Sequence, residues 1–511
     1  MTAPPLRRLA ILIALALAGA PAIAQDRPSE EDVFGKPAEE TPHQPAQAEP
    51  AGAQPASPES PADKAERKGP RVLEGEAGLE NRLSSVLGRT DDPLKIGGLL
   101  YLRSNLNARE HTPPSQWTLT APALTDLFLD ARPLDRVRGF VLGRMFFDPT
   151  HTASSTGLTS EKTPPPNPQV LLDQLWVSFD LERTAFVTLG RQHVKWGVGR
   201  FWNPTDYLHA VRRDPLTVFD TRTGTYMARV NLPWERYGWS ITGLAVFEPL
   251  VTQAATTFVT SVVVPAGSTT TTSAGTPSNQ LAAVGGGGRA EFVLGSWEFG
   301  VDGVAQRGMR PRLGVDASGS LWELDLKGEL SLRTSSDVPL YRGTLASFGP
   351  YEPSGVRPAA VLAAEWSHKY SDEDSFTLGF EYFYNSNGYV DDQRPLYPVL
   401  ILANAFTPFY LGRHYAGAYL SLPQPGSWNL HTFTLSAISN LSDRSALVRL
   451  DWSMTFLTYL TLEAYLQGHL GTSDGEFRLG INLPNLGTSG SPSVFIGAQT
   501  VDLGLAVRLN L

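Results

Sequence analysis

Charged and aromatic side chains are most dense between residues 189 and 222, in the segment LGRQHVKWGVGRFWNPTDYLHAVRRDPLTVFDTR. Phe201, Trp202 and Tyr207 are too apolar for a free surface loop, so we expect the segment to fold against another part of the protein. It would bring with it a set of polar, charged and aromatic residues: Arg191, Gln192, Trp196, Asn203, Asp206, Arg212, Arg213 and Asp214. A compact cap on the outside of the protein is the alternative interpretation.

A second group of charged residues alternates with apolar ones, which places each set on one face of a strand. We expect eight of them to line a water-filled interior: Asp126, Asp130, Arg136, Arg138, Arg144, Glu323, Asp325 and Glu381. Basic charge on 136–144 opposite acidic charge on later strands would create a transverse field. A wet interior tolerates charges of either sign equally well, and the pattern does not select anions over cations.

Catalytic and metal-binding patterns are weak in this sequence. The nine histidines are scattered, and no His and Glu residues have the spacing of a metal-binding helix. His431 shares the parity of Asn429, as a hydrolase built on a barrel would require, but no serine is identifiable as its nucleophile. We therefore expect a protein that is not an enzyme and that uses neither a metal nor a cofactor.

Alternation of apolar and polar residues with a period of two continues through most of the chain after residue 94. Val501, Leu503 and Leu505 alternate with Asp502 and Gly504, as in a strand with one apolar face. Sixteen or twenty strands are alternatives, because 477–484 could add another. The pattern itself predicts about eighteen: 95–105, 123–132, 135–147, 169–181, 184–194, 224–232, 237–248, 286–295, 297–308, 310–318, 321–333, 357–369, 375–385, 412–422, 428–438, 444–453, 456–468 and 500–511.

The lengths of the predicted connections alternate as well. One end has short connections, such as 133–134 and 182–183, and the other has all the long ones, such as 195–223 and 249–285. This asymmetry, together with Trp residues near the short turns, is typical of outer-membrane barrels. No later segment approaches the roughly 18 apolar residues of a spanning helix. The predicted fold is all-β, a transmembrane antiparallel β-barrel.

The N-terminal part of the chain indicates export. Arg7 and Arg8 precede an apolar run, and Ala22-Ile23-Ala24 fits a signal-peptide cleavage site. The net charge of −9 argues against a nucleic-acid partner. The expected organisation is a signal peptide at 1–24, a disordered Pro/Ala/Glu-rich periplasmic arm at 25–70, a linker or short amphipathic helix at 71–93, and an outer-membrane barrel at 94–511.

One segment also resembles known proteins. It resembles porin-like outer-membrane barrel families of Gram-negative bacteria, in which a strand ending in Gly-Arg-Gln precedes a Trp-Gly pair and an Asn-Pro-x-Asp loop. The matching residues here are Gly190, Arg191, Gln192, Trp196, Gly197, Asn203, Pro204 and Asp206. The families in question are largely uncharacterised, and the resemblance implies a porin-like barrel. Leu511 departs from the terminal Phe or Trp that is usual in such barrels.

These observations favour a passive outer-membrane channel for small hydrophilic solutes, with its lumen narrowed by residues 196–222. The alternative is a structural or surface-interaction barrel with a plugged lumen, and a barrel hydrolase comes third. The expected partners are outer-membrane lipid, the solutes and the barrel-assembly machinery. The oligomeric state and the identity of the solutes stay open.

Overall fold

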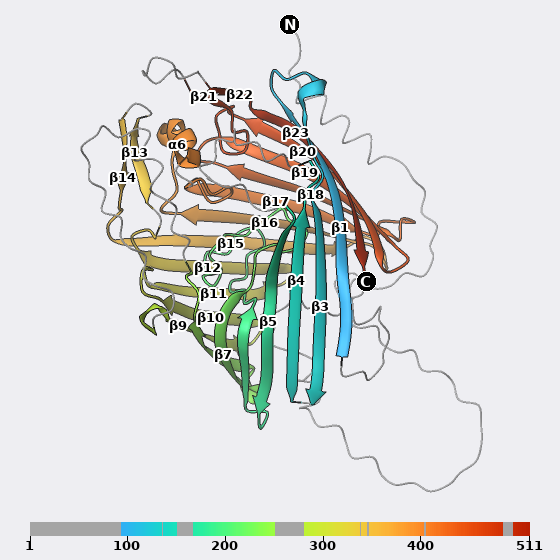
Figure 1. The fold of residues 1–511 in the computed structure, drawn as a ribbon, viewed down its shortest axis with the longest axis vertical. Coiled ribbons are helices and arrows are strands. Elements are labelled where there is room, and N and C mark those ends of the chain that lie inside the picture. The colour runs from blue at the N-terminus through green and yellow to red at the C-terminus, as the bar shows by residue number, and fades with distance from the viewer. Residues whose placement is uncertain are drawn as a thin grey trace, which may run out of the picture.

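The computed structural model describes residues 94–134, 136–150, 167–250, 281–337, 339–344, 347–402, 405–483 and 494–511. Its main sheet is antiparallel and closes into a ring, because the first strand pairs with the last along Leu99–Arg109 and Gln499–Asn510. Eighteen strands form this wall (Figure 1). The predicted signal peptide, arm and linker lie outside the described residues.

The wall strands follow one another around the ring in chain order. They are β1 (Leu94–Arg109), β3 (Ala123–Leu134), β4 (Val137–Phe147), β5 (Gln169–Leu181), β6 (Ala185–Gln192), β7 (Thr225–Trp234), β8 (Trp239–Val246), β9 (Gly285–Leu294), β10 (Trp297–Ala305), β11 (Arg312–Leu321), β12 (Leu324–Thr334), β15 (Val356–Lys369), β16 (Ser375–Asn385), β17 (His414–Pro423), β18 (His431–Asn440), β19 (Ser445–Phe456), β20 (Leu460–Gly471) and β23 (Gln499–Asn510).

Each of the eighteen predicted strands has its counterpart in this wall, with ends that agree to within four residues. The alternatives of sixteen or twenty strands are wrong, because the extra hairpin near 481–496 forms a separate two-stranded sheet. The possible strand at 477–484 contains β21 (Ile481–Leu483), which lies outside the wall. Further short elements in the connections were not predicted from the sequence: β2 (Thr118–Thr120), β13 (Leu340–Thr344), β14 (Ser347–Tyr351), β22 (Val494–Ile496), α6 (Tyr397–Leu402) and the 3-10 turns Pro114–Gln116, Glu235–Tyr237, Leu281–Ala283 and Asp391–Leu396.

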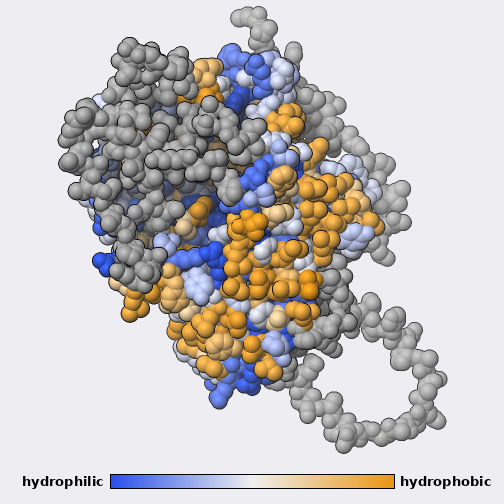
Figure 2. All heavy atoms as spheres, in the orientation of Figure 1, coloured by the Kyte–Doolittle hydropathy of each residue, from blue (hydrophilic) through white to orange (hydrophobic). Residues whose placement is uncertain are grey.

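The alternation in the sequence becomes the division between the two faces of the wall. On β23, Leu505 is 67% exposed on the outside, whereas Asp502 is 6% exposed and faces inward. Figure 2 shows apolar side chains gathered over the outside of the wall. An apolar outer face and a polar inner face are the arrangement of a barrel that spans a lipid bilayer. Within the described residues, no helix has the length and apolar character needed to cross a membrane.

The two ends of the barrel differ in their connections. The turns at one end are tight: Glu182 and Arg183 both have positive φ (54° and 55°), as in a type I′ hairpin turn. We call this the short-turn end. The opposite end, the long-connection end, carries α6 and the β13–β14 hairpin (Figure 1). The predicted asymmetry of the connections is therefore present in the structure.

The outer face of β20 offers a direct test of this division. Leu466 points outward and is 48% exposed, while the next residue, Gln467, faces inward and donates a hydrogen bond to Asp502. Leu466→Arg should cost about 2–4 kcal/mol of folding free energy in lipid, because it places a charge in the apolar band. Gln467→Arg should be tolerated. Urea titration of the barrel folded into lipid vesicles measures both, and equal losses would contradict the assignment of faces.

Candidate functional site

The long connection between β6 and β7 turns into the barrel. We call residues 193–224 the inner loop; its green trace runs within the ring of strands in Figure 1. Trp202 and Tyr207 are completely buried in it (0% exposed). The Tyr207 hydroxyl donates to the carbonyl of Leu313 (2.9 Å) and approaches the Ser331 hydroxyl (3.0 Å), both on the far wall. The loop therefore lies against the inner face of strands distant from its own.

Two inward-facing carboxylates hold the backbone of the inner loop. Glu329 on β12 accepts hydrogen bonds from the amides of residues 198 and 199 (2.6 and 2.7 Å) and from the Thr205 hydroxyl (3.0 Å). Glu381 on β16 accepts three more from the amides of residues 200–202, at 2.7–3.2 Å. Buried backbone amides without an acceptor are costly, and these carboxyl oxygens supply the acceptors. Glu329 and Glu381 thus anchor the loop.

The position of these anchors makes the loop cross the barrel. Along the ring, β12 and β16 lie six and eight strands beyond β6, and half the circumference of this wall is nine strands. Gly197 lets the backbone approach so closely: its φ is +92°, and a Cβ there would lie 2.6 Å from the Glu329 carboxylate. The Trp-Gly pair of the sequence motif therefore has a structural reason.

Apolar side chains fill the space on two sides of the inner loop. Toward β7, β8 and β10, the residues Trp196 and Leu208 pack with Met227 and Val246. Toward β15–β19, the Trp202 ring stacks on Phe383 at 5.6 Å, and its indole N–H donates to the carbonyl of Phe409 (2.8 Å). A third contact joins Phe219 to Tyr101 on β1, with ring centroids 5.1 Å apart.

A polar stretch of wall faces the interior between β19 and β1. The Tyr465 ring on β20 lies between two guanidinium groups, Arg103 at 4.9 Å and Arg449 at 4.0 Å from its centroid. Beside them Arg508 forms a 3.1 Å ion pair with Glu463. These side chains are arginines, a carboxylate and a phenol, and Tyr101 of β1, which packs on Phe219, donates to the same carboxylate of Glu463. We call β1, β19, β20 and β23 the polar wall.

The inward charges predicted on the first strands neutralise one another locally. Arg144 forms a bidentate pair with Asp126 at 2.8 Å, and Arg138 pairs with Asp130 at 2.8 Å. Arg136 lies in the turn before β4, 3.8 Å from Asp180, and not on the strand predicted to begin at 135. A basic wall facing an acidic wall is therefore not the arrangement of these residues.

The predicted acidic residues of the later strands have different places. Glu323 lies in the turn between β11 and β12, where it accepts a hydrogen bond from the Trp366 indole (3.2 Å). Asp325 faces inward at the short-turn end and accepts a hydrogen bond from the Ser320 hydroxyl. Glu381 is the anchor described above. Of the three, the structure brings only Glu381 to the inner loop.

The residues predicted to act together in the 191–214 segment divide into three groups. Arg191 stays on the outer face of β6, where it pairs with Glu248, so it does not join the interior. Gln192 ends β6, buried, with its amide near the carbonyls of Thr188 and Met227. The structure places the others within the inner loop: Trp196, Asn203, Asp206, Arg212, Arg213 and Asp214.

Charged side chains of the inner loop have strongly unequal surroundings. Burial and the neighbouring Arg213 lower the pKa of Lys195. Burial alone would raise the pKa of Asp206, but His209 and Arg222 outweigh it and hold that pKa well below its ordinary value. Asp214 is exposed and accepts a hydrogen bond from the amide of Leu216 at 2.9 Å, as a turn residue does. Within the loop, the surroundings therefore favour the ionised form of Asp206 and disfavour the charged form of Lys195.

Sequence reasoning missed several residues of this site. Asp173 on β5 and the two loop histidines, His193 and His209, form a hydrogen-bonded chain that no local spacing announces. His431, considered for catalysis, lies on the outer face, and the Trp452 indole donates to its Nδ1 at 3.0 Å. No group of three or more metal-ligating side chains occurs among the described residues.

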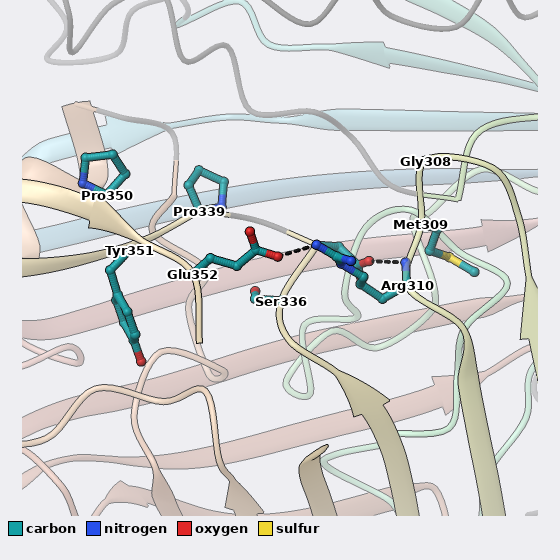
Figure 3. A pocket seen from close by; sticks show the side chains of 9 residues that line it. Gly308, Met309, Arg310, Ser336, Pro339, Pro350, Tyr351 and Glu352 are labelled. Carbon is teal, nitrogen blue, oxygen red and sulfur yellow. Dashed lines mark hydrogen bonds and ion pairs between the residues drawn. The ribbon is translucent and has the colours of Figure 1, made fainter. Parts of the chain in front are cut away.

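A separate cavity of about 660 Å³ opens at the long-connection end (Figure 3). Met309, Arg310, Asp337, Tyr351 and Glu352 are among its lining residues. Arg310 pairs with Glu352, and its amide donates to the Asp337 carboxylate at 2.7 Å. The cavity contains none of the residues that the sequence analysis selected.

The closed wall, apolar outside and charged inside, defines an antiparallel β-barrel of eighteen strands. No protein-family model matches the sequence, and comparison with curated proteins finds no similar sequence. Among solved structures, the chain is similar to OccAB1 of Acinetobacter baumannii, at 9% identity over 82% of this chain and 96% of that one, with a TM-score of 0.48.

Two further solved structures are similar in the same way. OccAB4 of Acinetobacter baumannii is 8% identical over 82% of this chain and 98% of that one, with a TM-score of 0.48. A triple mutant of Rhodopseudomonas blastica porin is 10% identical over 82% of this chain and 100% of that one, with a TM-score of 0.38. This likeness is one of fold alone.

Removal of one anchor should loosen the inner loop. Glu381→Ala deprives three backbone amides of their acceptor and should lower the free energy of local opening by about 2–4 kcal/mol, which corresponds to roughly 30-fold faster cleavage or more. Trypsin cleavage after Arg212 and Arg213 in the detergent-solubilised barrel measures the opening. Asp325→Ala is the matched control, because that carboxylate bonds to Ser320 on the wall. Equal cleavage of both variants would contradict the anchoring role.

Proposed function

We propose that this protein is an outer-membrane channel for the passive passage of small hydrophilic solutes, with a lumen narrowed by the inner loop. The observation that carries the proposal is the crossing of a closed, outwardly apolar barrel by a loop that Glu329 and Glu381 anchor. A wall of this kind separates a polar interior from lipid. A fixed obstruction inside it restricts solutes by size and charge.

The passage lies between the inner loop and the polar wall. The aromatic packing toward β15–β19 leaves little room on that side, since Trp202 and Phe383 are both buried there. The side with Arg103, Arg449 and Tyr465 is lined by polar groups, of which Arg103 and Tyr465 are partly exposed and Arg449 is buried. Such a lining suits water and hydrophilic solutes.

The same aromatic packing favours a second candidate, a surface-interaction barrel whose lumen is plugged. The β13–β14 hairpin and α6 pack together through Tyr341, Tyr397 and Leu400 into a small apolar cluster at the long-connection end. Such a cluster would support a surface that binds a partner outside the cell. Conductance of the purified protein separates the two candidates, because a plugged barrel passes no steady current.

The channel should prefer anions. Arg200 lies over the Tyr419 ring at 3.7 Å, and Arg212 lies 5.6 Å from the Tyr410 ring centroid, so both guanidiniums meet aromatic faces. Within the described part of the chain, neither these two nor Arg213 forms an ion pair. The two anchor carboxylates, Glu329 and Glu381, bond to loop amides and not to these arginines. Positive charge thus remains uncompensated at the proposed narrowing.

Shortening the inner loop should widen the narrowest point. Replacing residues 198–214 by a short Gly-Ser linker removes both anchors' partners and should raise single-channel conductance severalfold in planar lipid bilayers. Unchanged conductance in a correctly folded variant would contradict the narrowing. A wild-type protein without current would favour the plugged barrel.

Ion selectivity provides a finer test. The double change Arg200→Gln and Arg213→Gln should shift the reversal potential in a salt gradient in the direction of greater cation permeability. The reason is that two positive charges without an ion-pair partner are removed from the path. Arg191→Gln is the matched control: it removes an arginine from the outer face and should leave the reversal potential unchanged. A shift of the same size in both variants would refute the assignment of the path.

The orientation in the outer membrane can be tested by labelling, since the chain has no cysteine. Cysteines introduced at Trp117 or Leu281, in long connections, should react on whole cells with a membrane-impermeant maleimide. Cysteines at Arg183 or Glu235, in short turns, should react only after the membrane is opened. The reverse pattern would place the long connections in the periplasm.

A further inference from the structure

A chain of charged groups fastens the inner loop to the wall on the side of its own strands. Asp173 on β5 is fully buried, and its carboxylate lies 3.2 Å from Arg144 and 2.8 Å from Nε2 of His193. The pairing of β4 with β5 shifts register here: Leu142 faces Gln174 and Gly143 faces Leu172, so Asp173 has no partner across the ladder. This bulge turns the carboxylate inward, toward the loop.

The other end of the chain lies within the inner loop. Nδ1 of His209 is 3.2 Å from the Asp206 carboxylate, and Arg222 binds the other oxygen of that carboxylate at 2.8 Å. Arg222 also pairs with Asp220 at 2.6 Å. Both imidazole rings are buried, and Nδ1 of His193 lies 3.4 Å from Nε2 of His209. The two rings therefore face each other between two carboxylates.

The number of protons in this arrangement follows from the bonding. An ionised carboxylate only accepts hydrogen bonds, so Asp173 requires a hydrogen on Nε2 of His193, and Asp206 requires one on Nδ1 of His209. A third hydrogen is needed between the two inner nitrogens. Two neutral imidazoles carry two ring hydrogens in all. With both carboxylates ionised and a hydrogen bond between the two rings, the pair would bind one more proton than its neutral form and carry one positive charge.

Other charges around the pair are compatible with a single extra proton. The ionised state of Asp206 follows from its lowered pKa, which burial opposes but His209 and Arg222 produce. From β3 and β4, Asp126 and Arg144 compensate each other. The remaining groups that act at this place come from the loop and from β12: Lys195, Arg213, Asp220, Arg222 and Glu329.

We propose that His193 and His209 form a proton-operated latch: the proton shared between their rings fastens the 209–222 part of the inner loop to Asp173, and its loss releases that part. The fastened state binds one more proton than the released state. By linkage, the free energy that favours fastening must fall as pH rises through the titration of the pair. Imidazole suits such a latch, because it is the side chain that changes charge nearest to neutral pH.

A divalent metal ion is the competing occupant of the gap. Metal-ligating histidines also donate their outer N–H to carboxylates, as these two do. The cationic Arg144, Arg222 and Lys195 nearby oppose an added divalent charge. The described residues supply no third ligand. A proton satisfies the same geometry with a single charge.

A spin label on the inner loop tests the latch without reference to conduction. Val211, two residues after His209, is 61% exposed and accepts a hydrogen bond from Arg222 through its carbonyl. Val211→Cys carries the label in the full-length barrel in lipid vesicles. Label mobility should rise between pH 5 and pH 9. In the His193→Gln/His209→Gln background it should be high at every pH, because neither glutamine binds the shared proton.

His469→Gln is the matched control. His469 lies on β20, away from the inner loop's histidines. It is also buried, and its Nε2 also lies 2.8 Å from a carboxylate, that of Asp502. The rise in mobility with pH should survive in this variant. A wild-type label with mobility independent of pH, or the same rise in the double-glutamine background, would overturn the proposal. Release of the label by a chelator at constant pH would overturn it in favour of a metal ion.

Circular dichroism and resistance to heat in detergent, measured on each variant, establish that the wall is folded. The single variant His209→Gln supplies a second reading if the double variant does not assemble. It should also abolish the pH-dependent rise, because one glutamine removes the partner of the shared proton. Retention of the full rise in His209→Gln would refute the latch.

Discussion

The interior of this barrel depends on a mutual requirement between two carboxylates and a stretch of backbone. The backbone amides of residues 198–202 are buried away from water and have no neighbouring strand to pair with. A buried amide without a hydrogen-bond partner costs folding free energy. Glu329 and Glu381 are themselves buried and need donors. Each satisfies the other. Because this bonding fixes the loop backbone across the ring, the aromatic clusters around Trp196 and Trp202 can form on either side of it.

Charge inside the barrel is distributed by the same rule of local compensation. On β3–β5 the arginines meet aspartates on neighbouring strands, as Arg144 meets Asp126. On β9–β11 Arg289 meets three carboxylates, those of Glu291, Asp302 and Asp316, at 2.7, 2.9 and 2.6 Å. The pairs on β3–β5 add rigidity to the wall but little net field, whereas the cluster on β9–β11 holds more acidic than basic groups. The electric field at the centre of the barrel is therefore set by the inner loop together with this cluster. In the inner loop, the anchor carboxylates bond to backbone amides and not to a cationic side chain.

The wall of the barrel is predictable from the sequence because its two faces meet different solvents. The alternation of Asp502 and Gly504 with Leu503 and Leu505 can be recognised without reference to the rest of the chain. The inward folding of residues 196–222 is also suggested by their apolar side chains. The sequence does not reveal the anchors of the loop, Glu329 and Glu381. They lie more than a hundred residues further along the chain, and their sequence pattern is that of any charged residue facing the lumen.

Other parts of the site depend on single-residue irregularities that a regular period conceals. Asp173 faces inward only because a bulge shifts the register of β5, and Arg191 keeps the outward phase of Leu189. The histidine pair joins residues 16 positions apart through a fold of the loop. The strand number was open in the sequence for a related reason, since the short strands near 481–496 have the composition of wall strands but pair only with each other.

The inner loop also acts as a strut. Its hydrogen bonds connect the arc of wall near β5 and β6 with the arc at β12 and β16. The inner loop contacts the polar wall through the Phe219 ring, which packs on Tyr101 of β1. That wall includes the seam where the first and last strands meet. Lateral pressure from the surrounding membrane would therefore deform the ring mainly at the seam. The width of the passage beside the seam would then change with membrane pressure more than the distance between the arcs that the inner loop connects.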